Sequence, residues 1–310
     1  MKAKSIIFLI IAAILIVGGI VTCIVCNSLA SKSNLNLLSD TVDAQGNAIT
    51  SDELADYGIT SLGINMKDID VNIISGAKES YVEFVNINPA VYDYTVSGYK
   101  MTLKTINPFD ITSLVKFRKN GSGFCGLRSY FFLNKYDKVN SAVNIYISDD
   151  ITLSEISVKL ENGNVSIKNI NSDCLYDFDV NNGDLKIDSV KTMLETTIEV
   201  KKGNLEILSS SLRKTDFSVE FGNVTFNDGE RSQYYVSCKS GAVYLDESEQ
   251  GDSVEGIIYP ETLNDKTEES DPEATTDENE SEQEELLSLP DEIKGSVTNG
   301  NIYINSKINE

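Results

Sequence analysis

The sequence predicts an all-β chain, a parallel β-solenoid of coils about 20 residues long, behind a single N-terminal transmembrane helix. Three observations support this prediction. An apolar run lies at the N-terminus, glycines recur at nearly constant intervals through the second half, and apolar and polar residues alternate on both sides of these glycines.

The N-terminal run, Ile6–Cys26, contains no charged residue and follows Lys2 and Lys4. A helix of this length rises about 31 Å, enough to cross a hydrocarbon core of about 30 Å. Because positive residues stay on the cytoplasmic side, we expect a single-pass protein of the cell membrane with its N-terminus inside and the bulk of the chain extracytoplasmic. A cleaved signal peptide is the alternative, but its apolar region is shorter, and Ser28-Leu29-Ala30 is only a weak cleavage site.

Composition and repeats set the other boundaries. We expect the following parts: a cytoplasmic tip and anchor at 1–31, a polar stalk at 32–56, an irregular β segment that starts the solenoid at 57–150, regular coils at 151–246, a disordered acidic insertion at 247–292 and a terminal coil at 293–310. The acidic tract carries −17 of the net charge of −22, and too few of its residues are apolar for it to bury a core. We expect 295–305 to fold back beyond it and block an exposed sheet edge.

The repeat is defined by six glycines, the first five at intervals of 20, 20, 19 and 19 residues. They are Gly163, Gly183, Gly203, Gly222, Gly241 and Gly300. The residues two and four places after each glycine are apolar, as in Val165 and Ile167, and a polar residue usually stands between them. A period of two places both apolar side chains on one face of a strand, and a second strand precedes each glycine. The glycine itself is expected at a corner with positive φ.

One such unit cannot bury its apolar face alone, so stacked units at about 4.8 Å predict a continuous interior. A β-meander of Asn-Gly hairpins is the alternative. Cys125, Cys174 and Cys238 lie outside the predicted span, an odd number. Stacking places Cys174 and Cys238 three rungs apart, about 14 Å, which is too far for a disulfide, so both are expected as free thiols.

This pattern resembles a known family. A basic tip, one span, an irregular β segment ending in Asn144-Ile145-Tyr146-Ile147 and coils of the Gly-Asn-Val-x-Ile type are similar to the toastrack or "putative adhesin" family of bacterial envelope proteins, a domain of unknown function. The resemblance covers about residues 57–245 and the final coil. It implies an envelope protein with β-strand repeats and supplies no catalytic residue.

The residues give little support for chemistry. The chain has no His, which excludes imidazole bases, Ser-His and Cys-His pairs and His-ligated metals. The acids available to a polysaccharide-cleaving solenoid are Asp173, Asp177, Asp179 and Asp184, with Lys186 or Arg213 as base or cation. Asp179 and Asp184, however, sit at outward positions of an ordinary strand, where a solvated face is the expected interpretation. Asn162, Asn164, Asn182 and Asp184 offer oxygen ligands for calcium, although turn geometry alone also explains Asn beside Gly.

The expected function is therefore non-enzymatic: a membrane-anchored envelope protein that presents a β-solenoid for structural or adhesive binding, without cofactor, metal or nucleic-acid partner. The expected partners are the membrane, through Ile6–Cys26, and a cell-wall polymer, glycan or envelope protein. The outward ladder offered for docking is Ser166, Lys186, Glu206, Thr225, Tyr244 and Tyr303. An envelope-stress sensor acting with a membrane partner through Gly18 and Gly19 is the alternative, and a polysaccharide-cleaving enzyme a remote one.

Overall fold

A computed structural model describes residues 12, 15–21, 41–42, 48–53, 58–87, 92–105, 141–227, 232–259 and 290–306. The chain divides into two compact units, Met1–Thr50 and Ser51–Glu310. In the first unit, residues 15–21 are helical, and β1 (Thr41–Val42) pairs antiparallel with the start of β2 (Ala48–Glu53). Within the described ranges, no helix is both long and apolar enough to span a membrane. Most of Ile6–Cys26 lies outside these ranges, so the transmembrane span stays a prediction.

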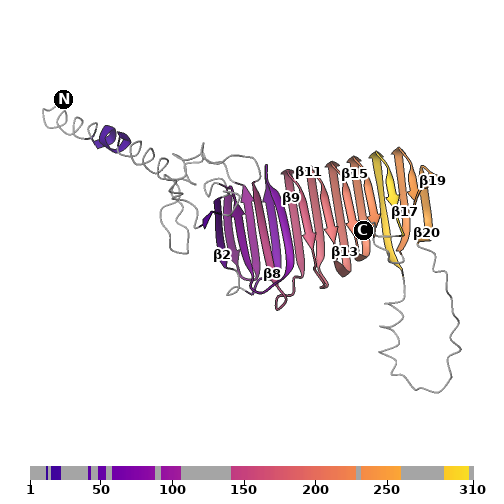
Figure 1. The fold of residues 1–310 in the computed structure, drawn as a ribbon, viewed down its shortest axis with the longest axis horizontal. Helices are drawn as coiled ribbons and strands as arrows, with labels where there is room; N and C mark the ends of the chain where they lie inside the picture. The colour runs from indigo at the N-terminus through magenta and orange to yellow at the C-terminus, as the bar shows by residue number, and fades with distance from the viewer. Residues whose placement is uncertain are drawn as a thin grey trace, which may run out of the picture. The chain divides into compact units, whose positions relative to one another are not determined.

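The second unit is all-β and consists of two sheets of mainly parallel strands in a solenoid-like arrangement (Figure 1). The first sheet runs in the order β5 (Tyr81–Val85), β8 (Ala142–Ser148), β4 (Asp70–Ala77), β10 (Val165–Lys168), β12 (Leu185–Asp188), β14 (Leu205–Leu208), β16 (Val224–Asn227), β22 (Ile302–Ile304), β18 (Val243–Leu245) and β19 (Ser248–Gly251). The second runs β20 (Ser253–Tyr259), β17 (Ser232–Ser240), β21 (Asp291–Asn299), β15 (Ser211–Phe221), β13 (Lys191–Lys202), β11 (Leu175–Asn182), β9 (Glu155–Asn162), β3 (Ser61–Met66), β7 (Lys100–Thr105) and β6 (Tyr92–Ser97).

Each regular coil contributes one strand to each sheet, and the apolar residues of both strands face a common interior. Val165 and Ile167 pair in register with Leu185 and Ile187 of the next coil, and all four are at most 2% exposed. Val158 of the strand before the glycine is equally buried. Stacking of equivalent strands therefore gives a parallel arrangement, whereas the hairpin meander would have given antiparallel neighbours.

The corner between the two strands explains why glycine recurs. All six repeat glycines have positive φ, between 126° and 151°. At Gly203, an added Cβ would lie 2.0 Å from the carbonyl oxygen of Gly183 in the preceding rung. The backbones of successive corners are thus in contact, which leaves no space for a side chain.

The residue after each glycine forms a hydrogen-bonded ladder along the corner. Its side-chain oxygen accepts from the backbone N–H of the equivalent residue one rung further on. The ladder begins at Asp70 of the inserted coil, which follows Ile69 and takes the equivalent position. From there the chain of acceptors and donors runs through Asn164, Asp184, Asn204, Asn223, Asn301 and Ala242, with donor–acceptor distances of 2.7–3.0 Å. The ladder ends at Ala242, whose side chain has no oxygen.

The order of the coils departs from the order of the sequence at both ends. The first coil of the chain, β3–β4, lies between β7–β8 and β9–β10. The last coil, β21–β22, lies between β15–β16 and β17–β18, and Figure 1 shows this yellow strand between the orange ones. The expectation that 295–305 blocks the sheet edge is therefore wrong. Antiparallel strands take this end of the stack instead, because β19 and β20 turn back along β18 and β17.

Two further expectations need correction. The acidic tract is not uniformly without structure, because β19 and β20 occupy Ser248–Tyr259, where Val254 is buried and Ile257 and Tyr259 pack against the core; residues 260–289 lie outside the described ranges. Cys174 and Cys238 are buried free thiols, as predicted, but the inserted coil separates them by four rungs, not three.

Candidate functional site

The candidate site is a hollow created by the insertion of β3–β4. Residues 149–154 join β8 to β9 and must climb two rungs, because β4 lies between β8 and β10 and β3 lies between β7 and β9. The next connection, 169–174, joins β10 to β11 and climbs one. The inserted coil continues from β4 into β5, so it has no connection of its own that would lie between 149–154 and 169–174. The space between the two connections therefore remains open.

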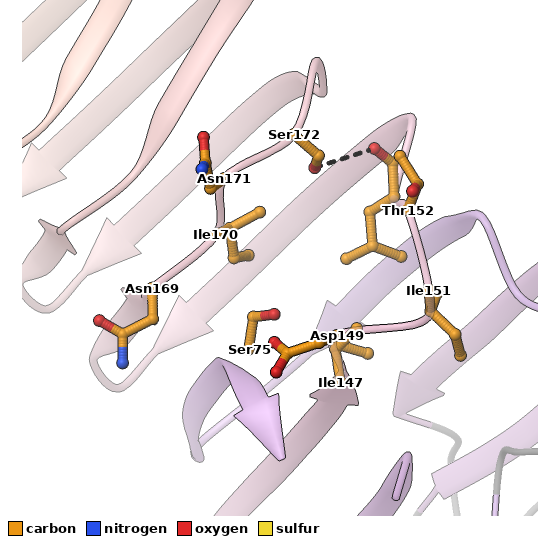
Figure 2. Close-up of a pocket in the computed structure, with 10 residues that line it drawn as sticks. Ser75, Ile147, Asp149, Ile151, Thr152, Asn169, Ile170, Asn171 and Ser172 are labelled. Carbon is orange, nitrogen blue, oxygen red and sulfur yellow. Dashed lines mark hydrogen bonds between the residues drawn. The ribbon is translucent and has the colours of Figure 1, made fainter. Parts of the chain in front are cut away.

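This first hollow has a volume of about 230 Å³ (Figure 2). Beneath it lie the buried apolar side chains of Ile147, Leu153 and Ile170, each at most 3% exposed. Its rim is polar and comes from both connections and from β4. The rim residues are Ser75, Asp149, Thr152, Asn169, Asn171 and Ser172.

Most of the rim is available to a ligand. Ser172 Oγ donates to the carbonyl oxygen of Leu153 at 3.3 Å, which holds the two connections together on one side. Among the residues that the structure describes, the other five rim side chains have no hydrogen bond or ion pair. Along the neighbouring corner, by contrast, the side-chain oxygens are used by the ladder.

A second hollow of about 590 Å³ lies beside the first and shares the lining residues Ser75 and Asn169 with it. Tyr81 of β5 and Tyr146 of β8 line it, with their rings stacked at a centroid distance of 4.5 Å. Burial, and then the negative charge of Glu83, raise the pKa of both phenols. Both hydroxyls are therefore neutral, and the second hollow offers aromatic surface beside Lys78 and Glu79.

The outward residues predicted for docking form a continuous row on the first sheet, and four of the six contact one another within this row. Ser166, Lys186, Glu206, Thr225, Tyr303 and Tyr244 follow one another in register. Lys186 Nζ lies 3.1 Å from Glu206 Oε2, and the rings of Tyr244 and Tyr303 stack at 5.2 Å. The row contains neither of the two hollows.

The acids considered for catalysis each have a separate partner, and Asp177 accepts from Ser157 Oγ at 3.5 Å. Asp179 pairs with Lys159, Asp173 accepts from the backbone N–H of Met193, and Asp184 belongs to the corner ladder. Three of the four residues considered for calcium have oxygens with protein partners: Asn162 Oδ1 accepts from Asn182 Nδ2, Asn164 Oδ1 from the N–H of Asp184, and Asp184 Oδ1 from the N–H of Asn204. In the described ranges, no cluster of three or more carboxylates or thiols has the geometry of a metal site.

None of the residues that line the hollows was predicted from the sequence as a site residue. Their positions depend on which coil stacks on which, and the spacing of the glycines does not contain that information. One signal was present: residues 57–150 lack the regular glycine corner, and this irregular segment is the one that rearranges the stack.

The fold defines the class of protein: an all-β chain whose repeats stack into two mainly parallel sheets around one apolar interior. The Toastrack DUF4097 family profile matches residues 59–256, so the chain belongs to the Toastrack DUF4097 family. No curated protein matches the chain.

Solved structures with similarity to the chain include three bacterial proteins. A "putative cell adhesion protein" from Clostridium sporogenes shares 14% identity over 84% of this chain and 99% of that chain, with a TM-score of 0.35. A "putative adhesin" from Bacteroides fragilis shares 11% over 86% and 99%, with a TM-score of 0.34, and one from Parabacteroides distasonis shares 8% over 83% and 96%, with a TM-score of 0.27. Because these TM-scores are low, we base no functional conclusion on them.

Proposed function

We propose that the protein is a non-enzymatic binding protein of the bacterial cell envelope, anchored by Ile6–Cys26, which holds a glycan of the cell wall in the joined hollows. One observation carries the proposal: five side chains able to form hydrogen bonds surround the first hollow without protein partners among the described residues, and an aromatic pair lies directly beside them. Sugar rings present apolar faces and many hydroxyl groups, so a lining of amides, hydroxyls and aromatic rings suits them.

The charges around the hollows favour a neutral polymer over an anionic one. Asp149 and Glu79 are the acidic residues of the two linings, opposed by Lys78 alone in these linings. Phosphate-rich polymers would meet net negative charge here. The glycan strands of peptidoglycan are a neutral, hydroxyl-rich alternative, and a solenoid anchored in the membrane would meet them on the outer side.

Co-sedimentation of the full-length protein with purified peptidoglycan sacculi tests this function. The site variant Asp149→Ala/Thr152→Ala removes two rim groups, and Thr197→Ala/Glu199→Ala, on the exposed face of β13, removes the same kinds of group elsewhere. With about 1 kcal/mol for each lost hydrogen bond, we expect the site variant to bind about tenfold or more weakly and the control to bind like the native protein. Equal binding by both variants would contradict the proposal.

A further inference from the structure

The C-terminal coil occupies a slot between two parts of the solenoid that precede it in sequence. In the second sheet, β21 pairs with β15 on one side and with β17 on the other, and β22 does the same between β16 and β18. β15 and β17 do not pair with each other. The unit formed by β17–β20 is therefore joined to the other coils through a segment that is more than 30 residues further along the chain.

The two walls of the slot match each other in register. Ser218 and Ser237 both pair with Ser296, and Val219 and Cys238 both pair with Val297. If the C-terminal coil left, β17 could therefore lie directly on β15 with inward and outward residues still aligned. The unit β17–β20 would move as a body, since β19 and β20 pair only with β18 and β17 among the described strands.

The corner ladder also survives such a move. Asn223 Oδ1 now accepts from the N–H of Asn301, and Asn301 Oδ1 accepts from the N–H of Ala242. With the coil absent, Asn223 Oδ1 would meet the N–H of Ala242 directly. Gly222 and Gly241 are 19 residues apart, the same interval as Gly203 and Gly222, which occupy adjacent rungs. The chain between β16 and β17 is thus long enough for a one-rung step.

One contact favours the inserted coil over the closed arrangement. Gly295 faces Phe217 across the β15–β21 pair, and an added Cβ there would lie 2.4 Å from both the ring and the carbonyl oxygen of Phe217. In the closed arrangement Val236 would take the place of Gly295, because both occupy the same register position. Phe217 would then have to repack. Because Gly295 has no side chain, β21 packs against Phe217 without displacing it, whereas Val236 of β17 would displace it.

From these observations we propose that β21–β22 is an exchangeable coil: when it leaves the slot, β17–β20 closes onto β15–β16 in the same register. The solenoid shortens by one rung, and the C-terminal strands are freed while the rest of the stack stays intact. This conformational device goes beyond the proposed glycan binding and does not depend on it.

Pairs of engineered cysteines in the outward serine row distinguish the two arrangements in the full-length chain, with Cys23, Cys26 and Cys125 replaced by serine. Ser218→Cys with Ser296→Cys joins adjacent strands in the inserted arrangement. Ser218→Cys with Ser237→Cys places the two cysteines on strands that are about 10 Å apart in the inserted arrangement and about 5 Å apart in the closed one. Only the second distance permits a disulfide. Glu199→Cys with Ser237→Cys is not adjacent in either arrangement and reports unfolding.

Under mild oxidation we expect the 218–296 disulfide to form fastest and the 218–237 disulfide to form slowly but measurably faster than 199–237. Gly295→Ala should speed 218–237 by about tenfold, because its Cβ cannot be accommodated in the slot. Ile293→Ala/Val297→Ala weakens insertion by lost burial and should act in the same direction. If 218–237 forms no faster than 199–237 in all three backgrounds, or at a rate independent of these substitutions, the exchangeable coil is refuted.

Discussion

Replacing Gly203 with alanine tests the stacked corner on which the whole solenoid depends. The substitution places a Cβ at φ +145° and 2.0 Å from the carbonyl oxygen of Gly183. The unfavourable backbone conformation costs about 1–2 kcal/mol and the overpacking about 1–3 kcal/mol, so we expect a loss of about 2–5 kcal/mol in the free energy of unfolding. The cost should be high in this range because the atom in contact belongs to the backbone of the neighbouring rung and cannot rotate away.

Gly251→Ala is the matched control. Gly251 also has positive φ, +96°, but an added Cβ meets nothing within 4 Å, so only the conformational part, about 1–2 kcal/mol, should be lost. Urea unfolding followed by circular dichroism gives both values from the midpoints and slopes. If Gly203→Ala costs no more than Gly251→Ala, successive corners are not in contact, and the reasoning that links the glycine interval to stacking is refuted.

Three other outcomes follow from single contacts. Asn204→Ala removes the acceptor of the Asn223 N–H and should lower the free energy of unfolding by about 1 kcal/mol, measured by the same urea assay; a neutral effect would show that water replaces the ladder. Burial raises the pKa of Cys174 to about 12, so the contribution of its neutral thiol to the free energy of unfolding is complete below the ordinary value of 9.0 and is lost as pH rises towards 12. Between pH 8 and pH 10.5, the free energy of unfolding of the native protein should fall by about 2 kcal/mol more than that of Cys174→Ala. Parallel pH curves for the two proteins would contradict this. A hydrogen bond from Ser61, and then the charge of Lys100, lower the pKa of Glu155. The contribution of its carboxylate to the free energy of unfolding is therefore present above the ordinary value of 4.5 and is lost as pH falls through the lowered pKa. The difference in free energy of unfolding between the native protein and Ser61→Ala should narrow from pH 7 to pH 3, and a constant difference would contradict this reasoning.

The coils were predictable because their signals are local. Alternation around Gly183 fixes which side chains face inward, and the burial of Leu185 and Ile187 follows directly from that pattern. The order of the coils was not predictable in this way. β17 and β21 carry the same pattern, so either could stack on β15. Only the exception at Gly295, opposite Phe217, distinguishes them, and its meaning requires the partner strand to be known.

The candidate site could not be predicted from the sequence for a related reason. Asp149 and Asn169 are ordinary loop residues in isolation, and nothing in their spacing indicates that they face one another. They line one hollow because β4, which precedes both in sequence, lies between β8 and β10, the strands from which their loops start. A feature made by long-range order of this kind has no local signature.

The first and the last coil are each inserted between two other coils, and the two insertions have different consequences. At the N-terminal end, the inserted β3–β4 forces residues 149–154 to climb two rungs and leaves a hollow whose rim is free to bind. At the C-terminal end, the inserted β21–β22 holds apart two strand pairs that match in register, which makes a closed alternative available. In both places the terminal coil is held from both sides, so it gains two sets of strand contacts where an end coil would gain one. The hollow and the slot therefore both arise where the first and the last coil displace the regular path of the chain.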